Sequence, residues 1–350
     1  MDLSVFAHRK VLVTGHTGFK GVWLTALLNR LGCEVHGISL PTSSNSPLSN
    51  LQPSNLKSET FLDLGDDNGL DIVLAAIQPE LVFHLAAQSL VLTSYADPNL
   101  TFKSNVMGTS NLLAAAEKNS SIRGIIVVTS DKVYENSETG LPFKESDALG
   151  GKDPYSASKA AAELVTRAWE NVYKLHKSPI KICAARSGNV IGGGDRAENR
   201  LVPDILRSIQ SHSDVVLRNP NSVRPWQHVL DALWGYVLIG QKMLSNREVA
   251  TAYNFGPDSQ SIQTVEVVAD MFISMSNVKI SKKLLPGFFP EATTLLLDSS
   301  KAERDLGWKS KLSSIQAIEW TCEFEFPAPN LSYQEILDFQ ISRYLDGIHV

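Results

Sequence analysis

The sequence predicts an α/β fold: a doubly wound parallel sheet with helices on both faces, followed by a smaller, irregular α/β domain. Two observations carry this prediction. Strand-like and helix-like segments alternate through the first half of the 350 residues, an order typical of parallel sheets with right-handed crossovers. Residues 125–128 form a continuous apolar run, as expected for a strand that is buried on both faces. After Gly188 the alternation breaks down, which indicates the second domain.

The expected elements follow one another regularly up to residue 187. Strands are expected at residues 11–13, 34–39, 81–85, 124–129 and 182–185, and helices at 22–31, 70–77, 100–118 and 154–175. The Ser-, Asn- and Pro-rich stretch 41–57 predicts a long loop: a lid, a flap over the adenosine of a cofactor, or a mobile insertion. Further helices are expected at 201–210, 226–243, 261–277 and beyond 313, with short strands at 215–217 and 253–255. We therefore predict a first domain of residues 1–187 with a returning segment at about 226–258, and a second domain of residues 188–225 and 259–350.

Composition excludes several classes of partner. The formal net charge is −5 and like charges form no block, so the sequence lacks the basic patch that nucleic acids or anionic membranes would require. Cys33, Cys183 and Cys322 lie far apart and have neither disulfide nor metal spacing, as expected for free thiols in a reducing compartment. No signal peptide precedes the first strand, and no apolar stretch reaches the roughly 20 residues of a membrane span. The sequence therefore predicts a soluble cytoplasmic protein with no metal site.

A glycine-rich turn joins the first expected strand to the first expected helix. Gly15, Gly18 and Gly21 stand at the spacing G-x-x-G-x-x-G, directly after an apolar strand and at the start of a helical pattern. In this context the glycines allow a tight turn, a close approach to a pyrophosphate and close packing of helix on strand. The helix N-terminus adds free N–H groups for the phosphates. The candidate cofactor residues of this turn are Gly15, His16, Thr17, Gly18, Phe19, Lys20 and Gly21.

Tyr155 and Lys159 form a candidate acid–base pair. Asp153 and Pro154 open a helix here, and the i, i+4 spacing puts both side chains on one helical face. A nearby ammonium favours phenolate, so we expect Lys159 to acidify Tyr155, which can then accept a hydroxyl proton while hydride leaves the same carbon. A surface Tyr–Lys pair is the structural alternative, and the glycine turn one domain-length upstream argues against it.

Together, the glycine turn and the Tyr155–Lys159 pair resemble the extended short-chain dehydrogenase/reductase superfamily, whose first domain is a Rossmann fold. The resemblance implies further cofactor contacts: an acidic residue near the adenine with its neighbour, a loop along the ribose, and a buried asparagine. In this sequence the acidic residue and its neighbour are Asp63 and Leu64. The loop is formed by Leu85, Ala86 and Ala87, and the asparagine is Asn105. It also implies a homodimer joined by helices 100–118 and 157–175, whose many alanines permit close helix–helix approach.

Ser130, Asp131 and Lys132 follow a strand upstream of Tyr155 and indicate one branch of this superfamily. In nucleotide-sugar 4,6-dehydratases this position carries a hydroxyl residue, an aspartic acid and a base, usually glutamate. Lys132 in place of glutamate resembles the branch that acts on CDP-glucose. The resemblance implies a redox-neutral dehydration in which Tyr155 takes the C4 hydroxyl proton, Ser130 binds the same oxygen and Asp131 protonates the departing C6 hydroxyl. Lys132 either removes the C5 proton or, as a cation, stabilises an enolate, and both possibilities stay open.

Several residues of the second half are candidate substrate contacts. Arg200 and Arg224 can bind the diphosphate of a nucleotide sugar, because the arginine fork matches phosphate geometry. A surface ion pair is the alternative for either arginine. Asn189 is a candidate for the diphosphate and the sugar. The remaining candidate substrate contacts are Gln88, Ser130, Leu201 and His228.

NAD is the expected cofactor, although the second strand lacks the usual acidic residue at its carboxyl end. That strand runs into Ser39 and Leu40, and Glu34 lies at its opposite end. No basic residue follows until Lys57, so a 2′-phosphate would also lack a partner. The sequence therefore favours NAD, held without a strong ribose clamp, which predicts a weakly bound or exchangeable cofactor.

Three functions compete at this point. The leading one is an NAD-dependent dehydratase of a nucleotide hexose. A 4-epimerase or a reductase on the same scaffold would keep Tyr155 and Lys159 but would not need Asp131 and Lys132. A non-catalytic cofactor-binding regulator would be expected to have lost Tyr155 or Lys159, and both are present.

Overall fold

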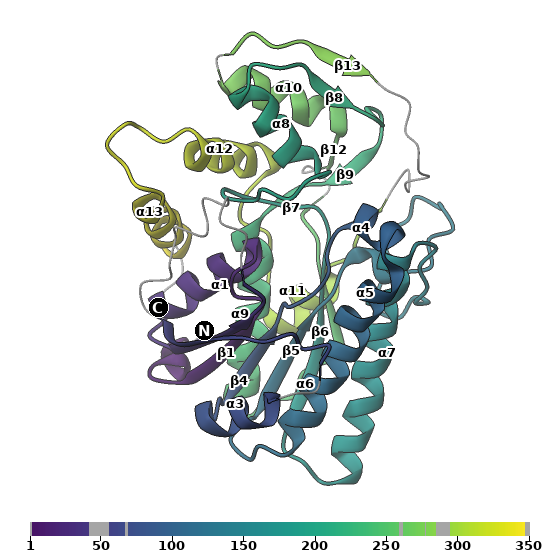
Figure 1. The fold of residues 1–350 in the computed structure, drawn as a ribbon, viewed down its shortest axis with the longest axis vertical. Helices are drawn as coiled ribbons and strands as arrows, with labels where there is room; N and C mark the ends of the chain where they lie inside the picture. The colour runs from purple at the N-terminus through teal and green to yellow at the C-terminus, as the bar shows by residue number, and fades with distance from the viewer. Residues whose placement is uncertain are drawn as a thin grey trace.

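The computed structural model describes residues 2–41, 56–66, 69–258, 262–276, 278–284 and 295–346. Its larger lobe is built on a seven-stranded sheet in the order β11-β6-β5-β4-β1-β2-β3, in which every neighbouring pair is parallel (Figure 1). The strands are β1 (Lys10–Thr14), β2 (Glu34–Ser39), β3 (Leu56–Phe61), β4 (Leu81–His84), β5 (Gly124–Val128), β6 (Lys181–Ser187) and β11 (Ala252–Phe255). The predicted doubly wound α/β fold is confirmed.

Helices cover both faces of this sheet. On β1, Val11 and Val13 belong to one apolar cluster while Leu12 belongs to another, because successive side chains of a strand point to opposite faces. The first face is covered by α1 (Phe19–Arg30), α9 (Val229–Leu244) and α11 (Ser300–Leu306). The second is covered by α3 (Leu70–Ile77), α6 (Gly108–Glu117) and α7 (Pro154–Leu175). Burial on both faces explains the continuous apolar run of β5.

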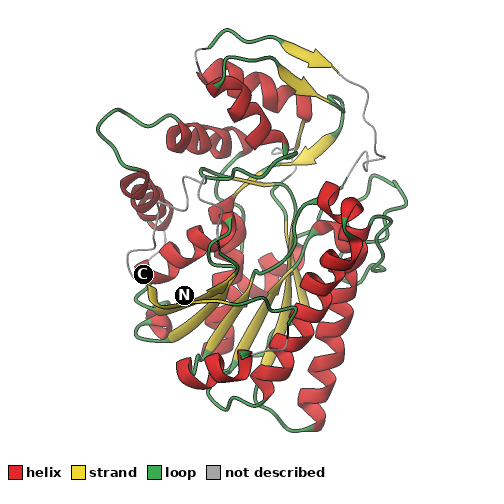
Figure 2. Ribbon diagram, in the orientation of Figure 1, coloured by secondary structure: helices red, strands yellow, loops and turns green. Residues whose placement is uncertain are grey.

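A smaller lobe lies beyond the carboxyl ends of the strands, at the top of Figure 2. Its apolar core joins Ile205, Phe272 and Ile318 and is separate from the two clusters of the sheet. Its elements are α8 (Leu201–Gln210), β8 (Val215–Leu217), β9 (Val223–Pro225), β12 (Ile262–Thr264), α10 (Val265–Ser276), β13 (Lys282–Leu284) and α12 (Ser314–Glu325). Between the lobes, β7 (Val190–Ile191) pairs in parallel with β10 (Gln227–His228).

The C-terminal part of the chain contributes to both lobes. Helix α11 packs against α9 and β11, and α13 (Tyr333–Leu345) packs against α1. Ile336 and Ile341 of α13 belong to the same apolar cluster as the core of α1. From the sequence we expected the chain to return to the sheet once, at about residues 226–258. In the structure α11 and α13 also return to the larger lobe.

Two local differences separate the structure from the predicted elements. No strand is expected at residues 56–61, because these mostly polar residues give little apolar signal, yet β3 pairs with β2 at the edge of the sheet. The predicted loop 41–57 therefore ends at β3, and residues 42–55 lie outside the described part of the chain. The single helix expected at 100–118 is divided into α5 (Pro98–Phe102), a π-helical turn η2 (Lys103–Met107) and α6. The other short elements are η1 (Ser4–Phe6), α4 (Val91–Ala96) and η3 (Asp131–Val133).

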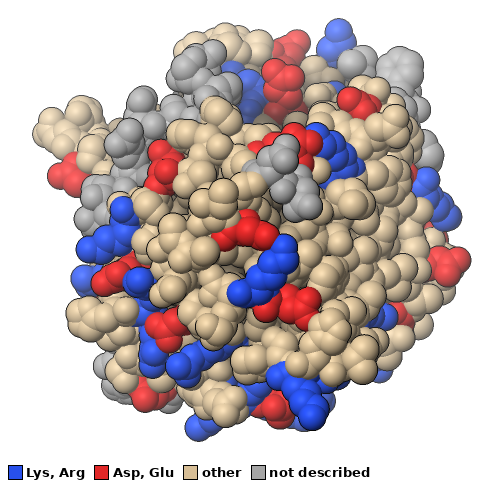
Figure 3. Space-filling view, turned by 60° about the horizontal axis from the view of Figure 1, so that its bottom comes forward, with Lys and Arg blue, Asp and Glu red and all other residues tan. Residues whose placement is uncertain are grey.

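The surface in Figure 3 mixes acidic and basic side chains without a block of one sign. Among the described residues, no helix is both long enough and apolar enough to cross a bilayer. All three cysteines are free, with Cys183 and Cys322 buried and Cys33 half-buried.

Candidate active site

The glycine turn forms a close-fitting cradle between β1 and α1. Gly15 has φ of +73°, and a Cβ atom there would lie 2.7 Å from the backbone nitrogen of Ala86. A Cβ at Gly21 would overlap the carbonyl oxygen of Gly15, so helix and turn could not pack as they do. Gly18 caps α1, where a Cβ would meet only the Gly15 oxygen, at 3.3 Å. The predicted turn, its contact with Leu85 and Ala86, and a helix N-terminus thus meet in one place.

Two polar side chains of the turn are engaged within the protein. The Nε2 atom of His16 lies 2.7 Å from Oε1 of Glu59 on β3, and the imidazole is buried. A Cβ at Gly37 would lie 2.6 Å from this ring, so the position on β2 must stay free of a side chain. The hydroxyl of Thr17 is 2.5 Å from that of Ser39, at the end of β2. The turn therefore offers a cofactor its backbone more than these side chains.

The side chain of Lys20 extends from the glycine turn to Ser187, at the end of β6. Its ammonium donates to Ser187 Oγ at 2.8 Å and to the hydroxyl of Tyr236 at 3.3 Å, and these two hydroxyls lie 2.7 Å apart. Burial lowers the pKa of Lys20 to about 8, and the charge of Arg200 acts in the same direction. Phe19, in contrast, packs into the apolar cluster of the first sheet face. Lys20 thus joins the cofactor turn to the strand end that carries Ser187.

The predicted adenine-side residues lie on the loop after β3. Asp63 accepts a hydrogen bond from the Gly65 amide at 2.9 Å and forms an ion pair with Lys103 at 3.4 Å. Leu64 is buried in the second sheet-face cluster, and its carbonyl accepts from Asn111 at 2.8 Å. Asp63 keeps a third of its side chain exposed and is the more accessible of the two.

Asn105 connects the ribose-side loop with the helix that carries Tyr155. Its Oδ1 accepts from the amide of Gln88 at 2.8 Å, and its Nδ2 donates to the Gln88 carbonyl at 3.0 Å and to Ser158 Oγ at 2.8 Å. It lies in the π-helical turn η2, a feature often found at functional sites. The Gln88 side chain likewise donates to Thr101 and to the Leu90 carbonyl. Both amides therefore position the loop that follows Ala87, rather than extending toward a ligand.

Helix α7 places Tyr155 and Lys159 on one face, as its spacing predicts. Asp153 caps the helix by accepting from the Ser156 amide at 2.9 Å. The Tyr155 hydroxyl hydrogen-bonds to Ser130, so the two predicted C4 residues meet. Lys159 is buried and donates to the Val128 carbonyl at 3.2 Å.

The expected acidification of Tyr155 by Lys159 is wrong for this structure. Burial raises the pKa of Tyr155 above its ordinary value, while the hydrogen bond with Ser130 and the charge of Arg200 oppose this. Burial and the charge of Lys20 lower the pKa of Lys159 to about 8, while the charge of Glu163 acts in the opposite direction. In this structure the pKa of Tyr155 is therefore set mainly by its burial and not by Lys159.

Asp131 is the one carboxyl among the catalytic candidates, and only 2% of its surface is exposed. Ser130 donates to its Oδ1 at 2.9 Å and accepts from the Lys132 amide at 3.2 Å, which fixes the short η3 turn. Within the described part of the chain, Oδ2 of Asp131 has no hydrogen-bond partner, and a Cβ at Gly188 would lie 2.6 Å from it. Burial raises the pKa of Asp131, against the charge of Lys132 and the hydrogen bond from Ser130. The carboxyl is therefore suited to act as a proton donor.

The two candidate arginines approach this site from the smaller lobe. Arg200 pairs with Asp195 at 3.0 Å and donates to Ser89 Oγ at 2.9 Å, on the loop after β4, so it bridges the lobes. Arg224 is buried, donates to the Val223 carbonyl at 2.8 Å, and its charge lowers the pKa of Asp131.

The other substrate candidates differ in accessibility. Asn189 is half-buried, and its carbonyl accepts from the Gln227 amide at 3.1 Å. Leu201 opens α8 and packs against the core of the smaller lobe. His228 is fully buried, with its ring 5.6 Å from that of Trp23 and 5.5 Å from that of Trp320, and burial lowers its pKa to about 3. A core position does not support the predicted contact of His228 with substrate.

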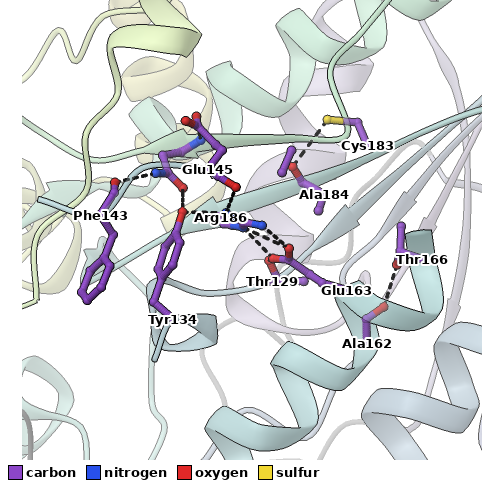
Figure 4. Close-up of polar contacts among 12 residues, drawn as sticks. Thr129, Tyr134, Phe143, Glu145, Ala162, Glu163, Thr166, Cys183, Ala184 and Arg186 are labelled. Atoms are coloured by element: carbon purple, nitrogen blue, oxygen red, sulfur yellow. Dashed lines mark hydrogen bonds and ion pairs between the residues drawn. The ribbon is translucent and has the colours of Figure 1, made fainter. Parts of the chain in front are cut away.

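Several residues around the site were not among those predicted from the sequence. Glu59 lies on the unpredicted strand β3, whose mostly polar residues gave no clear sequence signal. Ser187 and Tyr236 contact Lys20 from β6 and α9, and the sequence offers no spacing that links them. Glu163 and Arg186 form a buried ion pair behind the catalytic candidates (Figure 4). The position of Glu163, one helical turn after Lys159, was the signal for that pair.

Comparison with known proteins assigns the family. Residues 12–321 match the model of the GDP-mannose 4,6-dehydratase family. The chain belongs to this family. A member with closely related sequence is CDP-glucose 4,6-dehydratase of Salmonella typhimurium, 40% identical over 315 residues that cover 88% of each chain. UDP-glucose 4-epimerase of Pisum sativum is 28% identical over 334 residues, which cover 88% of this chain and 93% of the epimerase.

Solved structures agree with the fold of the family. Epimerase Mth375 of Methanothermobacter thermautotrophicus superposes with a TM-score of 0.80 at 24% identity. The superposition covers 91% of this chain and 92% of the epimerase chain. The dTDP-glucose 4,6-dehydratase of Bacillus anthracis, solved in complex with NAD, superposes with a TM-score of 0.76 at 21% identity. That superposition covers 94% of this chain and 99% of the dehydratase chain. The predicted resemblance to extended short-chain dehydrogenase/reductases of the nucleotide-sugar 4,6-dehydratase group is confirmed.

Proposed function

We propose that the protein dehydrates CDP-D-glucose to CDP-4-dehydro-6-deoxy-D-glucose with NAD as cofactor. The observation that carries this proposal is the buried Asp131 carboxyl beside the Ser130–Tyr155 hydrogen bond. A 4-epimerase or a reductase does not release the C6 hydroxyl and therefore needs no acid at the position of Asp131. The CDP-glucose part is supported by the 40% identity with the Salmonella dehydratase.

The glycine turn fits the pyrophosphate of NAD. A Cβ at Gly15 or Gly21 would collide with backbone, and Gly18 caps a helix whose first amides are free for phosphate oxygens. When bound, NAD would accept the hydride from C4 of the sugar and return it to C6. We propose Asp63 for the adenine side and Tyr155 with Lys159 for the nicotinamide side.

Tyr155 and Ser130 are suited to act on the C4 hydroxyl. Ser130 can hydrogen-bond the sugar oxygen while Tyr155 takes its proton as the C–H bond breaks. Because burial raises the pKa of Tyr155, positive groups are needed to make it a base, and Arg200 already acts in that direction.

Asp131 and Lys132 are suited to the elimination. The 4-ketone acidifies the C5 proton, and Asp131, whose pKa burial raises, can give a proton to the departing C6 hydroxyl. Lys132 either removes the C5 proton as a neutral amine or stabilises the enolate as a cation. After hydride reaches C6, C5 regains a proton and the reaction is redox-neutral.

We place the substrate diphosphate at Arg200 and Arg224 and the sugar near Asn189, because the two arginines face the catalytic candidates from the smaller lobe. The protein is also proposed to be cytoplasmic and homodimeric.

The experiment follows the hydride. With CDP-glucose deuterated at C4, we expect deuterium at C6 of the product and solvent hydrogen at C5, detected by mass spectrometry and NMR. Label in free reduced cofactor would contradict the proposal and identify an ordinary dehydrogenase. Inversion at C4 without loss of the C6 oxygen would identify an epimerase.

A further inference from the structure

A buried ion pair lies behind the catalytic candidates. Glu163 stands one helical turn after Lys159 on α7, and Arg186 lies on β6, beside Ser187. Neither side chain is more than 1% exposed. The Nε atom of Arg186 donates to both carboxylate oxygens of Glu163, at 2.8 and 3.0 Å, and its Nη2 donates to Oε2 (Figure 4). This bidentate geometry fixes both side chains.

The pair holds the segment of residues 130–132 at both ends. On one side, the hydroxyl of Thr129 donates to Oε1 of Glu163 at 2.7 Å. On the other side, Nη1 of Arg186 donates to the hydroxyl of Tyr134 at 2.6 Å, and the guanidinium lies 4.9 Å from the centre of that ring. Ser130, Asp131 and Lys132 are the only residues besides Val133 between these two anchors.

The network continues away from the site and leaves Tyr134 well fixed. Its hydroxyl donates to Oδ1 of Asn254 on β11 at 2.7 Å, and its ring stacks on Phe143 at 4.7 Å. The backbone amide of Asn254 donates to Glu145 at 2.8 Å. The anchors therefore rest on the sheet rather than on a free loop.

Stability alone is a weak explanation for such a pair, because desolvation offsets much of the attraction between buried charges. A geometric explanation is stronger, since the pair joins the two elements that the proposed reaction must align. Helix α7 carries Tyr155, which serves C4, and the segment after β5 carries Asp131, which serves C6. A displacement of about 1 Å between such groups can lower a rate roughly 100-fold.

We propose that Glu163 and Arg186 are positioning residues that hold the segment of residues 130–132 in register with α7. A sugar oxidised at Tyr155 then meets Asp131 before it can leave. The inference rests on the proposed dehydration. It assigns the pair an effect on the balance between the two half-reactions, rather than on the amount of folded protein.

Matched variants of the two anchors test the inference. Thr129→Val and Tyr134→Phe each remove one hydroxyl with little change of shape, whereas Thr129→Ser keeps the donor. With CDP-glucose, the Val and Phe variants should raise the ratio of 4-keto intermediate plus reduced nicotinamide to 6-deoxy product, roughly tenfold. Thr129→Ser should restore the wild-type ratio. The measurement is mass spectrometry of quenched reactions together with the absorbance of the reduced cofactor.

Glu163→Gln and Asp231→Asn separate positioning from stability. Asp231 is equally buried, but its carboxylate accepts its hydrogen bonds from residues 310–312 and Tyr344. We expect Asp231→Asn to lower the melting temperature at an unchanged product ratio, and Glu163→Gln to change the ratio. Equal losses of intermediate and product in the Thr129→Val, Tyr134→Phe and Glu163→Gln variants would overturn the inference. A wild-type protein that forms no 6-deoxy sugar would instead overturn the proposed function.

Discussion

At the scale of single residues, Asp131 is the group whose substitution should separate the two halves of the reaction. Asp131→Asn keeps the size of the side chain and can still accept from Ser130, but it cannot give a proton to the C6 hydroxyl. We expect oxidation at C4 to continue and dehydration to fall roughly 10²- to 10⁴-fold. Rapid-quench analysis should find a 4-keto hexose that retains its C6 oxygen, together with reduced nicotinamide.

The control for this variant is Tyr155→Phe. Because Tyr155 serves the first step, its loss should abolish every later event, including exchange of C5 hydrogen with solvent. An Asp131→Asn protein that forms 6-deoxy product at the wild-type rate would contradict the assignment of Asp131 as the acid.

Lys132→Met decides between the two roles that the structure leaves for this lysine. If Lys132 is the base, the variant should oxidise C4 but lose C5 exchange roughly 10²- to 10⁴-fold, since a positioned base is worth about this much. The measurement is incorporation of solvent deuterium at C5 by NMR. Retained exchange would leave Lys132 only the electrostatic role, in which its positive charge stabilises the enolate.

At the scale of elements, the glycine turn predicts two different outcomes for two alanine substitutions. A Cβ at Gly21 would overlap the Gly15 carbonyl, so Gly21→Ala should lower stability by about 2 kcal/mol. A Cβ at Gly18 meets only that carbonyl at 3.3 Å, so Gly18→Ala should fold but crowd the pyrophosphate. Thermal denaturation with and without NAD checks both: Gly18→Ala should keep its melting temperature and lose the shift caused by NAD. A full NAD shift in Gly18→Ala would place the cofactor elsewhere.

Elements with a strong apolar period were predictable from the sequence, and those without one were not. Helix α7 and strand β2 occupy the expected ranges because their patterns are clear and their ends carry distinct signals, such as Asp153 at the start of α7. Strand β3 is polar because it lies at the sheet edge, and the π-helical turn η2 has no apolar signature. Residues that a motif singled out, such as Tyr155 and Asp131, lie near one another in the structure, and their roles stay predictions.

Contacts that exist only after folding could not be predicted. Lys20 belongs to the glycine motif by sequence, yet its ammonium reaches Ser187 and Tyr236, more than 160 residues away along the chain. His228 was expected at the substrate, but two tryptophans enclose it. Both outcomes depend on the packing of α9 against α1 and on the contacts of Ser187 and Phe324 with α1, and the spacing of residues in the sequence carries no information about them.

At the scale of the whole molecule, the face formed by α5, η2 and α7 carries exposed apolar side chains. Leu100, Phe102 and Met107 of the α5–η2 segment are 42%, 38% and 51% exposed, and Leu164 of α7 is 55% exposed. Helices α5, α6 and α7 run along the same side of the sheet in Figure 1, and α7 contacts both α6 and η2. Apolar side chains that gather on one face favour association with a partner.

We therefore expect a homodimer joined through this face. Light scattering at micromolar concentration should give twice the chain mass of 38.3 kDa. Met107→Glu and Leu164→Glu should shift the protein toward monomer, because a charge would be buried at the centre of the contact. Phe339→Glu is the control: Phe339 is 55% exposed on α13, which packs against α1 on the other face of the sheet, and its substitution should leave the dimer intact. A wild-type monomer would refute the prediction, and a dimer unaffected by Met107→Glu and Leu164→Glu would move the interface to another surface.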